Sequence, residues 1–110
     1  VGEMKVKIKS FNGELPSYFS QCKAYNARHR SEFTFFIEDD EGDSWICLFD
    51  NCPNLNGGSW EVVMKLLTKQ QALKAYLAGY KIVYDDKGKF KQVNQNTRLN
   101  ASDEYYVLGC

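Results

Sequence analysis

The amino-acid sequence predicts an α+β fold in which an antiparallel sheet curls over one long helix. Two observations support this prediction. Short strand-like stretches occur before and after a central segment, Trp60 to Ala78, which itself carries apolar residues at helical spacing. Strands, one helix and further strands are typical of a sheet packed on a helix. We predict one domain over residues 1–110, because this length is close to the commonest size of a single domain.

The first strand is expected near the start of the chain. Apolar Met4, Val6 and Ile8 alternate with lysines, and this period-two pattern indicates a strand with one buried face. An acidic turn, 38–43, separates two further strands and suggests a hairpin. The remaining expected strands, chosen for aromatic and β-branched residues, are 18–25, 33–37, 45–49, 80–84, 89–93 and 105–108.

The helix is expected to begin after Ser59, a good N-cap residue, and to end before Gly79, where a left-handed residue closes a helix. Its apolar positions follow the spacing of one helical face: Trp60, Val63, Met64 and Leu67. A five-stranded barrel with a helix after the third strand is the OB-fold arrangement. We therefore predict an OB-fold-like antiparallel barrel of five to six strands with one long α-helix, about residues 60–78.

Composition limits the functions that the chain can perform. The 14 basic and 14 acidic residues balance, which argues against nucleic-acid binding through a basic field. No apolar run approaches the ~20 residues that span a bilayer. His29 is the single histidine and has no evident carboxylate partner, so we predict no catalytic set and no enzyme. We expect no cofactor and no metal, and we interpret the acidic run 38–43 as a solvated turn, not a calcium loop.

The cysteines form an even set: Cys22, Cys47, Cys52 and Cys110. They lack the close pairs that zinc sites use, so two disulfides in an oxidising compartment are favoured over zinc and over free buried thiols. Four cysteines allow three pairings, and their spacing alone does not choose among them. The cysteines therefore predict a protein of an oxidising compartment, and hence a secreted one.

The segment from Trp45 to Tyr84 resembles the B subunits of the pertussis toxin family. The matching features are a cysteine-bearing strand, a Gly-Ser loop, a Glu-Val pair, a Gln-Gln pair and a Leu-x-Gly helix end: Cys47, Gly58-Ser59, Glu61-Val62, Gln70-Gln71 and Leu77-Ala78-Gly79. The resemblance covers about 40 residues of the 110. Subtilase cytotoxin and typhoid toxin B subunits are similar in layout.

This resemblance implies a non-catalytic, receptor-binding subunit of a secreted bacterial one-A-five-B toxin. Five B subunits, identical or mixed, would form a ring whose helices line a pore around a catalytic A subunit, for example an ADP-ribosyltransferase. Trp60, Val63, Met64 and Leu67 would then form the pore and oligomer face. The family pattern also implies a Cys22–Cys47 disulfide, which leaves Cys52 to Cys110. The family usually has two cysteines near the C-terminus, whereas this chain has Cys110 alone.

The resemblance also implies binding of host glycans, which requires residue types that suit a sialylated sugar. An aromatic ring can contact the C–H face of a sugar, and arginine or serine can donate to a carboxylate. The nearest cluster of such types, chosen without matching to the family, is Ser17, Tyr18, Arg28, Arg30 and Ser31. Two alternatives remain: a monomeric secreted protein-binding or inhibitor module, and an OB-fold oligonucleotide binder with reduced thiols.

Overall fold

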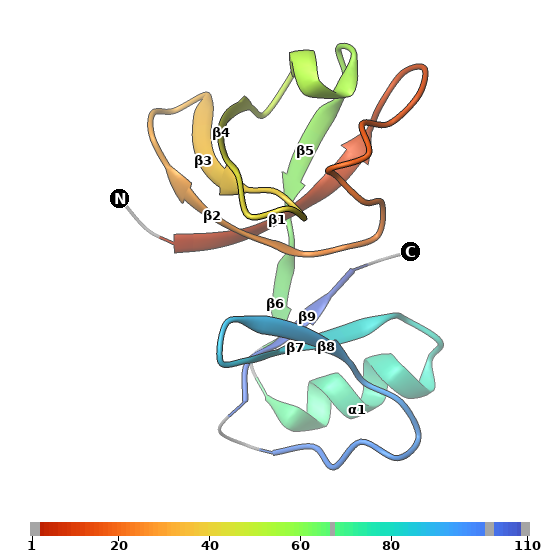
Figure 1. Ribbon diagram of the computed structural model, residues 1–110. Coiled ribbons are helices and arrows are strands. Elements are labelled where there is room, and N and C mark those ends of the chain that lie inside the picture. Colours follow the sequence, from red (N-terminus) through yellow and green to blue (C-terminus); the bar gives the residue numbers. More distant parts are fainter. Residues whose placement is uncertain (1–2, 67, 101–102, 109–110) are drawn as a thin grey trace. The chain divides into compact units, whose positions relative to one another are not determined.

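The computed structural model of the chain describes residues 3–66, 68–100 and 103–108 (Figure 1). Over this part of the chain it is an α+β structure with antiparallel strand pairs and one α-helix, as predicted. The elements are β1 (Glu3–Ser10), β2 (Tyr25–His29), β3 (Thr34–Glu38), β4 (Ser44–Leu48), the 3₁₀ turn η1 (Pro53–Leu55), β5 (Ser59–Val62), β6 (Met64–Leu66), α1 (Lys69–Leu77), β7 (Ile82–Asp86), β8 (Lys89–Gln92) and β9 (Tyr105–Val107). No helix among the described residues is long and apolar enough to cross a membrane.

The chain divides into two compact units, which we call unit 1 (Val1–Val62) and unit 2 (Val63–Cys110). Unit 1 contains a five-stranded sheet in the order β4-β3-β2-β1-β5. Unit 2 contains a four-stranded sheet in the order β6-β9-β7-β8, and α1 belongs to the same unit. The described strands form two open sheets and no closed barrel.

The core of unit 1 is aromatic. Trp60 is 3% exposed, and its ring meets those of Phe19, Tyr25 and Phe35 edge-on at centroid distances of 5.1, 5.9 and 5.7 Å. Such edge-to-face contacts place the positive rim of one ring against the negative face of another. The aliphatic residues Val6 and Ile8 of β1 pack in the same cluster, as their alternation with lysine predicts.

The core of unit 2 is smaller and mainly aliphatic. Ala72 of α1 packs with three residues: Ile82 of β7, Val93, which follows β8, and Tyr105 of β9. Ala72 is the buried residue of the helix, which therefore presents a narrow face to this cluster. The strands expected at 80–84, 89–93 and 105–108 correspond to β7, β8 and β9 with shifts of one or two residues at their ends.

The predicted helix from Trp60 to Ala78 is wrong over its first half. Trp60 lies in β5, Val63 is a buried residue between β5 and β6, and Met64 lies in β6 with 68% of its surface exposed. Leu67, the fourth member of the predicted pore face, lies outside the described residues. These residues share no helical face, because the sequence Trp-Glu-Val-Val suits an extended strand.

The helix begins instead at Thr68, its N-cap residue. The Thr68 hydroxyl accepts a hydrogen bond from the amide of Gln71 at 3.1 Å, which satisfies one of the first free N–H groups. Ser59, the predicted cap, pairs with Ser10 of β1. The predicted helix end is confirmed, since Gly79 has φ +95° just beyond the last turn and donates to Tyr76 O at 3.0 Å.

The strand expected at 18–25 is also wrong. Residues 18–24 form turns and irregular backbone, and β2 begins at Tyr25 and runs through Arg28 to His29, beyond the end of the expected strand. The reason lies in the side chains of this segment. Ser20 donates its backbone N–H to the Tyr25 hydroxyl at 2.8 Å, and its own hydroxyl donates to Asp40 at 2.6 Å, so the segment is folded by side-chain bonds and not by a strand ladder.

Candidate functional site

A row of solvent-facing side chains crosses β2, β3 and β4 of unit 1. The register pairs Arg28 with Phe36 and Phe36 with Ile46, so the three residues lie side by side on the sheet. All three are exposed, with Phe36 at 37% and Ile46 at 54%. Together with Arg30, which follows β2 by one residue, we call these residues the basic-aromatic face.

The alternation of the strands explains why these residues face outward. Successive side chains of a strand point to opposite faces of the sheet. Phe35 and Ile37, which flank Phe36, are buried in the core of unit 1. In β2 the same rule buries Ala27 and leaves Arg28 exposed. The basic-aromatic face is thus fixed by the residues packed behind it.

Within this face, Arg28 and Phe36 make a direct contact. The Arg28 guanidinium carbon lies 5.4 Å from the centroid of the Phe36 ring. Such a cation–π contact holds the planar cation in one orientation while its edge N–H groups remain able to donate. Arg30 lies just beyond the end of β2, where its backbone N–H donates to Thr34 O at 3.0 Å, and its side chain is exposed. This end of the hairpin therefore offers an arginine stacked on an aromatic ring, with a second exposed arginine two residues further along the chain.

The five predicted glycan-binding residues fall into two groups. Arg28, Arg30 and Ser31 lie at the β2–β3 end of the hairpin, where the Ser31 and Thr34 hydroxyls are 2.6 Å apart. Ser17 and Tyr18 lie beyond the other end of β3, because Tyr18 O accepts from the amide of Asp40 at 3.0 Å. At ~3.3 Å per residue, β3 separates the groups by about 16 Å.

Phe36 is the functional candidate that the sequence analysis did not assign to the site. The run Phe33-Thr34-Phe35-Phe36-Ile37 reads as one buried aromatic strand, and composition alone does not tell which phenylalanine faces solvent. The signal was present in the alternation, because a strand with Phe35 and Ile37 inside must place Phe36 outside.

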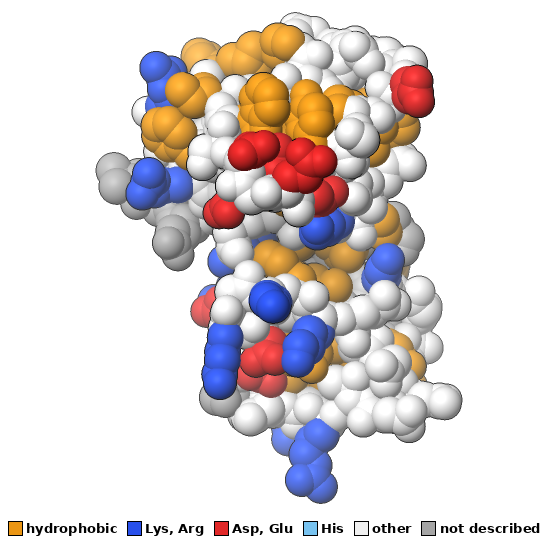
Figure 2. Space-filling model, viewed as in Figure 1, with side chains coloured by type: hydrophobic (Ala, Val, Ile, Leu, Met, Phe, Trp, Pro, Cys, Tyr) orange, Lys and Arg blue, Asp and Glu red, His pale blue; other side chains and the backbone are white. Residues whose placement is uncertain are grey.

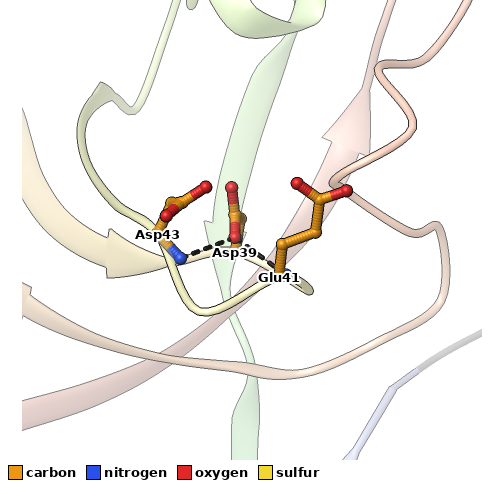
Figure 3. A group of neighbouring side chains, drawn as sticks. All are labelled: Asp39, Glu41 and Asp43. Carbon is orange, nitrogen blue, oxygen red and sulfur yellow. Dashed lines mark hydrogen bonds between the residues drawn. The ribbon is translucent and has the colours of Figure 1, made fainter.

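At the Tyr18 end, an acidic turn joins β3 to β4 (Figure 3). One carboxylate oxygen from each of Asp39, Glu41 and Asp43 lies within 4.8 Å of the others. Figure 2 shows a group of acidic side chains beside apolar side chains on one face of the molecule. Glu41 and Asp43 are exposed, as expected for a solvated turn, whereas Asp39 is buried at 7% exposure.

Asp39 explains the shape of this turn. One of its carboxylate oxygens accepts from the amides of Glu41 and Asp43, both at 2.9 Å, and the other accepts from Trp45 Nε1 at 2.7 Å. Burial raises the pKa of the Asp39 carboxyl, but these hydrogen bonds outweigh it and bring the pKa below its ordinary value. Because both oxygens of Asp39 are engaged, we assign the cluster to turn structure and not to a cation site.

A second carboxylate, Asp40, organises the segment before β2. It accepts hydrogen bonds from the hydroxyls of Ser20 and Tyr25 and forms an ion pair with Lys23. Burial raises the pKa of Asp40, but these donors outweigh it and the net pKa falls. Burial raises the pKa of Tyr25, and its hydrogen bond to Asp40 raises the pKa further. Tyr18 stacks on Trp45 in this region, at 5.0 Å and an interplanar angle of 7°.

The cysteines correct the pairing that the family pattern implied. Cys47 and Cys52 are free thiols buried in the core of unit 1. The Cys22–Cys47 and Cys52–Cys110 bonds are therefore not those of this structure, because Cys47 on β4 meets Cys52 and not Cys22. Cys22 is not one of the free thiols, and Cys110 lies outside the described residues.

Comparisons with known proteins found no relative of this chain. No protein-family model matches the chain, and no curated protein and no solved structure matches it significantly.

Proposed function

We propose that the protein is a non-catalytic, glycan-binding subunit of a secreted bacterial one-A-five-B toxin, and that the basic-aromatic face binds an acidic host glycan. The observation that carries this proposal is the contact between Arg28 and Phe36, with Arg30 two residues away. The likeness of residues 45–84 to pertussis-type B subunits supplies the toxin context.

The chemistry of sialic acid suits this face. Its carboxylate is best bound by arginine, which donates two parallel hydrogen bonds, and its ring C–H groups pack on an aromatic side chain. The Ser31 hydroxyl, at the same end of the hairpin, adds a donor or acceptor for sugar hydroxyls. Net charge is zero for the whole chain, so a local pair of cations is needed to attract an anion.

The opposite end of β3 is unsuited to such a ligand. Four carboxylates of the acidic segment, Asp39, Asp40, Glu41 and Asp43, follow β3 directly beside the Tyr18 backbone. Like charges disfavour the approach of a second carboxylate. We therefore assign the acidic sugar to Arg28, Arg30, Ser31 and Phe36 and leave Ser17 and Tyr18 out of the proposed site.

Assembly into a pentameric ring that carries an A subunit is part of the same proposal. Helix α1 supports it, because Leu73 and Leu77 lie one turn apart and are 47% and 74% exposed. Exposed leucines in one stripe are suited to contact with another copy of the chain. An OB-fold-like barrel is also part of the proposal, and it would be built on the five antiparallel strands of unit 1, which lie in the order β4-β3-β2-β1-β5.

The test of glycan binding compares two matched double variants. We expect the wild-type protein to bind sialylated glycans on an array, and Arg28→Ala with Arg30→Ala to weaken binding about tenfold or more, as loss of charge-assisted hydrogen bonds does. The control is Lys87→Ala with Lys89→Ala, which removes the same charge from exposed positions of unit 2. Equal binding by the two variants would contradict the assigned site.

Native mass spectrometry tests assembly. A five-copy ring, or a mixed ring with other B subunits, is expected. A chain that is strictly monomeric at micromolar concentration and silent on the array would instead favour the protein-binding or inhibitor module. Binding to single-stranded oligonucleotides that weakens steeply with salt would favour the oligonucleotide binder.

A further inference from the structure

Two cysteines lie side by side in the core of unit 1, outside the basic-aromatic face. Cys47 and Cys52 are 1% and 0% exposed and belong to the same buried cluster. Asn54, which follows Cys52 by two residues, donates from Nδ2 to the Cys47 sulfur at 3.7 Å, so the segment that carries Cys52 folds against the Cys47 side chain. The largest influence on the pKa of each thiol is the other thiol. Sequence spacing did not predict this contact, because the loop between the two residues folds back on β4.

The backbone fixes the two sulfur atoms in place. Cys47 is an inward-facing residue of β4, paired with Phe35. Asn51, with φ 52°, turns the chain after β4. Cys52 then precedes η1 and donates its N–H to Gly58 O at 2.8 Å, which closes the loop. Since a cysteine side chain has a single rotatable bond before its sulfur, these constraints hold the pair together.

The neighbours of the pair favour a thiolate at Cys52. Its pKa is lowered to about 5, first by the hydrogen bond from Cys47, which outweighs the effect of burial. Trp60 Nε1 is fully buried without a hydrogen bond of good geometry among the described residues, and its proximity to the Cys52 sulfur lowers the pKa of Cys52 further. Asn54 Nδ2 donates to the Cys47 sulfur at 3.7 Å. The site thus holds one nucleophilic sulfur beside a second thiol.

We propose that Cys47 and Cys52 are joined by a disulfide in the oxidised protein, which ties the end of β4 to the Asn51–Gly58 loop. The bond closes a ring of six residues. Because Trp60 packs in the same cluster, the bond also covers one side of the aromatic core. This inference goes beyond glycan binding and does not depend on it.

The reaction is thiol–disulfide exchange with a small disulfide oxidant such as oxidised glutathione. The Cys52 thiolate attacks one sulfur of the oxidant, which forms a mixed disulfide and releases one glutathione thiolate. The Cys47 thiol then loses its proton and attacks the Cys52 sulfur, which forms the Cys47–Cys52 bond and releases the second glutathione. The two cysteines lose two electrons and two protons, and the oxidant becomes two glutathione thiols. Because both sulfurs are buried in the finished fold, the exchange occurs after β4 and the loop that follows it have brought the two cysteines together and before the core closes over them.

Peptide mapping tests the pairing directly on the full chain. The reduced, unfolded protein is refolded in a glutathione redox buffer, then alkylated with iodoacetamide in denaturant so that buried thiols also react, and cut with trypsin without reduction. No lysine or arginine occurs between residues 31 and 64, so Cys47 and Cys52 remain on one peptide, Ser31–Lys65. We expect this peptide to be unalkylated and lighter than the dithiol form by two hydrogen atoms.

Two results would overturn the proposal. One is the same peptide with two alkylated cysteines, which would show a stable buried dithiol. The other is a cross-link from Ser31–Lys65 to the Cys22 peptide, Ser10–Lys23, or to the Cys110 peptide, Leu99–Cys110. A Cys52→Ser variant adds an independent readout, because its Cys47 should then be alkylated after unfolding and not be found in a bond with Cys22 or Cys110.

Discussion

Unit 1 and unit 2 bury their apolar residues in different ways. Unit 1 collects four aromatic rings, Phe19, Tyr25, Phe35 and Trp60, at edge-to-face distances in one core. Unit 2 packs Ala72, Ile82, Val93 and Tyr105 in one cluster and leaves the two leucines of its helix, Leu73 and Leu77, in solvent.

The two units leave different kinds of side chain exposed, and these suit different tasks. The buried residues of unit 2 are mainly aliphatic, with two tyrosines and no phenylalanine or tryptophan among the described residues: Val63, Ala72, Ile82, Val83, Val93, Tyr105, Tyr106 and Leu108. In unit 1 the aromatic core supports an outer face whose binding groups are polar and aromatic. In unit 2 the exposed leucines are a better match for a protein contact. The comparison therefore assigns glycan binding to unit 1 and assembly to unit 2, as proposals with separate tests.

The largest expected effect is that of Trp60→Ala. Removing this ring leaves a cavity against Phe19, Tyr25 and Phe35 and should lower the free energy of unfolding of unit 1 by about 3–5 kcal/mol. The measurement is urea denaturation followed by tryptophan fluorescence. Trp45 and Trp60 are the two tryptophans of the chain and both belong to unit 1, so the remaining Trp45 reports this unit alone.

The matched variant in unit 2 is Ile82→Ala, which truncates a fully buried side chain of β7. It should shift the circular-dichroism transition of α1 by about 2–5 kcal/mol and leave the fluorescence transition in place. If each variant moves both transitions together, the two units unfold as one cooperative body, which would contradict separate stabilities for unit 1 and unit 2.

Asp39→Asn should have the next largest effect, again in unit 1. The asparagine side chain keeps one acceptor oxygen, but its NH₂ group replaces the other. That NH₂ group would then face another N–H donor, either Trp45 Nε1 or the amides of Glu41 and Asp43, and the donor would lose its hydrogen bond. Urea denaturation followed by fluorescence should show a clear loss of stability. Asp43→Asn is the control, because its exposed side chain should change stability by no more than about 0.5 kcal/mol.

The same carboxylate predicts a pH dependence. The pKa of Asp39 is lowered from 3.8 in the folded state, so its contribution to stability is fully present above that value. The contribution is lost as the pH falls through the folded-state pKa. The stability of the wild-type protein should therefore decline more steeply below pH ~4 than that of Asp39→Asn. Parallel curves for the two proteins would contradict the assigned role.

A smaller effect is expected at the N-cap of α1 in unit 2. Thr68→Ala removes the acceptor for the Gln71 amide and should cost about 1 kcal/mol. The circular-dichroism transition of the helix measures it. Thr68→Ser keeps the hydroxyl and should restore most of the loss, whereas an equal loss in both variants would show that the hydroxyl does not cap the helix.

The sequence predicted the fold class, the β3–β4 hairpin and the helix end, since Asp39–Asp43 and Gly79 carry strong local signals. It did not predict the helix start. Trp60, Val63 and Met64 match helical spacing, but aromatic and β-branched residues also suit short strands, and packing of Trp60 on Phe35 decides for the strand. Short apolar runs do not distinguish the two by spacing alone.

The candidate site was predicted in part. Arg28, Arg30 and Ser31 are neighbours in sequence, and a hairpin end keeps sequence neighbours together. Tyr18 separates from them because β2 and β3 carry the chain from one end of the sheet to the other. The Cys47–Cys52 contact depends on the left-handed Asn51 and on the hydrogen bond from Cys52 N–H to Gly58 O, neither of which composition reveals.

The smallest effect on stability, and the sharpest test of unit 2, comes from Leu73→Gln with Leu77→Gln. Both side chains are exposed, so the double variant should change the stability of the chain by no more than about 0.5 kcal/mol per site. If they form the contact between copies, removing this apolar stripe exposes no new surface in the free chain but abolishes burial on assembly. Native mass spectrometry should then show rings for the wild-type protein and monomers for the variant, with sialylated-glycan binding per chain retained. Gln70→Ala with Lys74→Ala, polar positions of the same helix, is the matched control and should still form rings. Rings from the leucine variant would place the interface elsewhere, and loss of glycan binding per chain would mean that the two units do not divide these tasks.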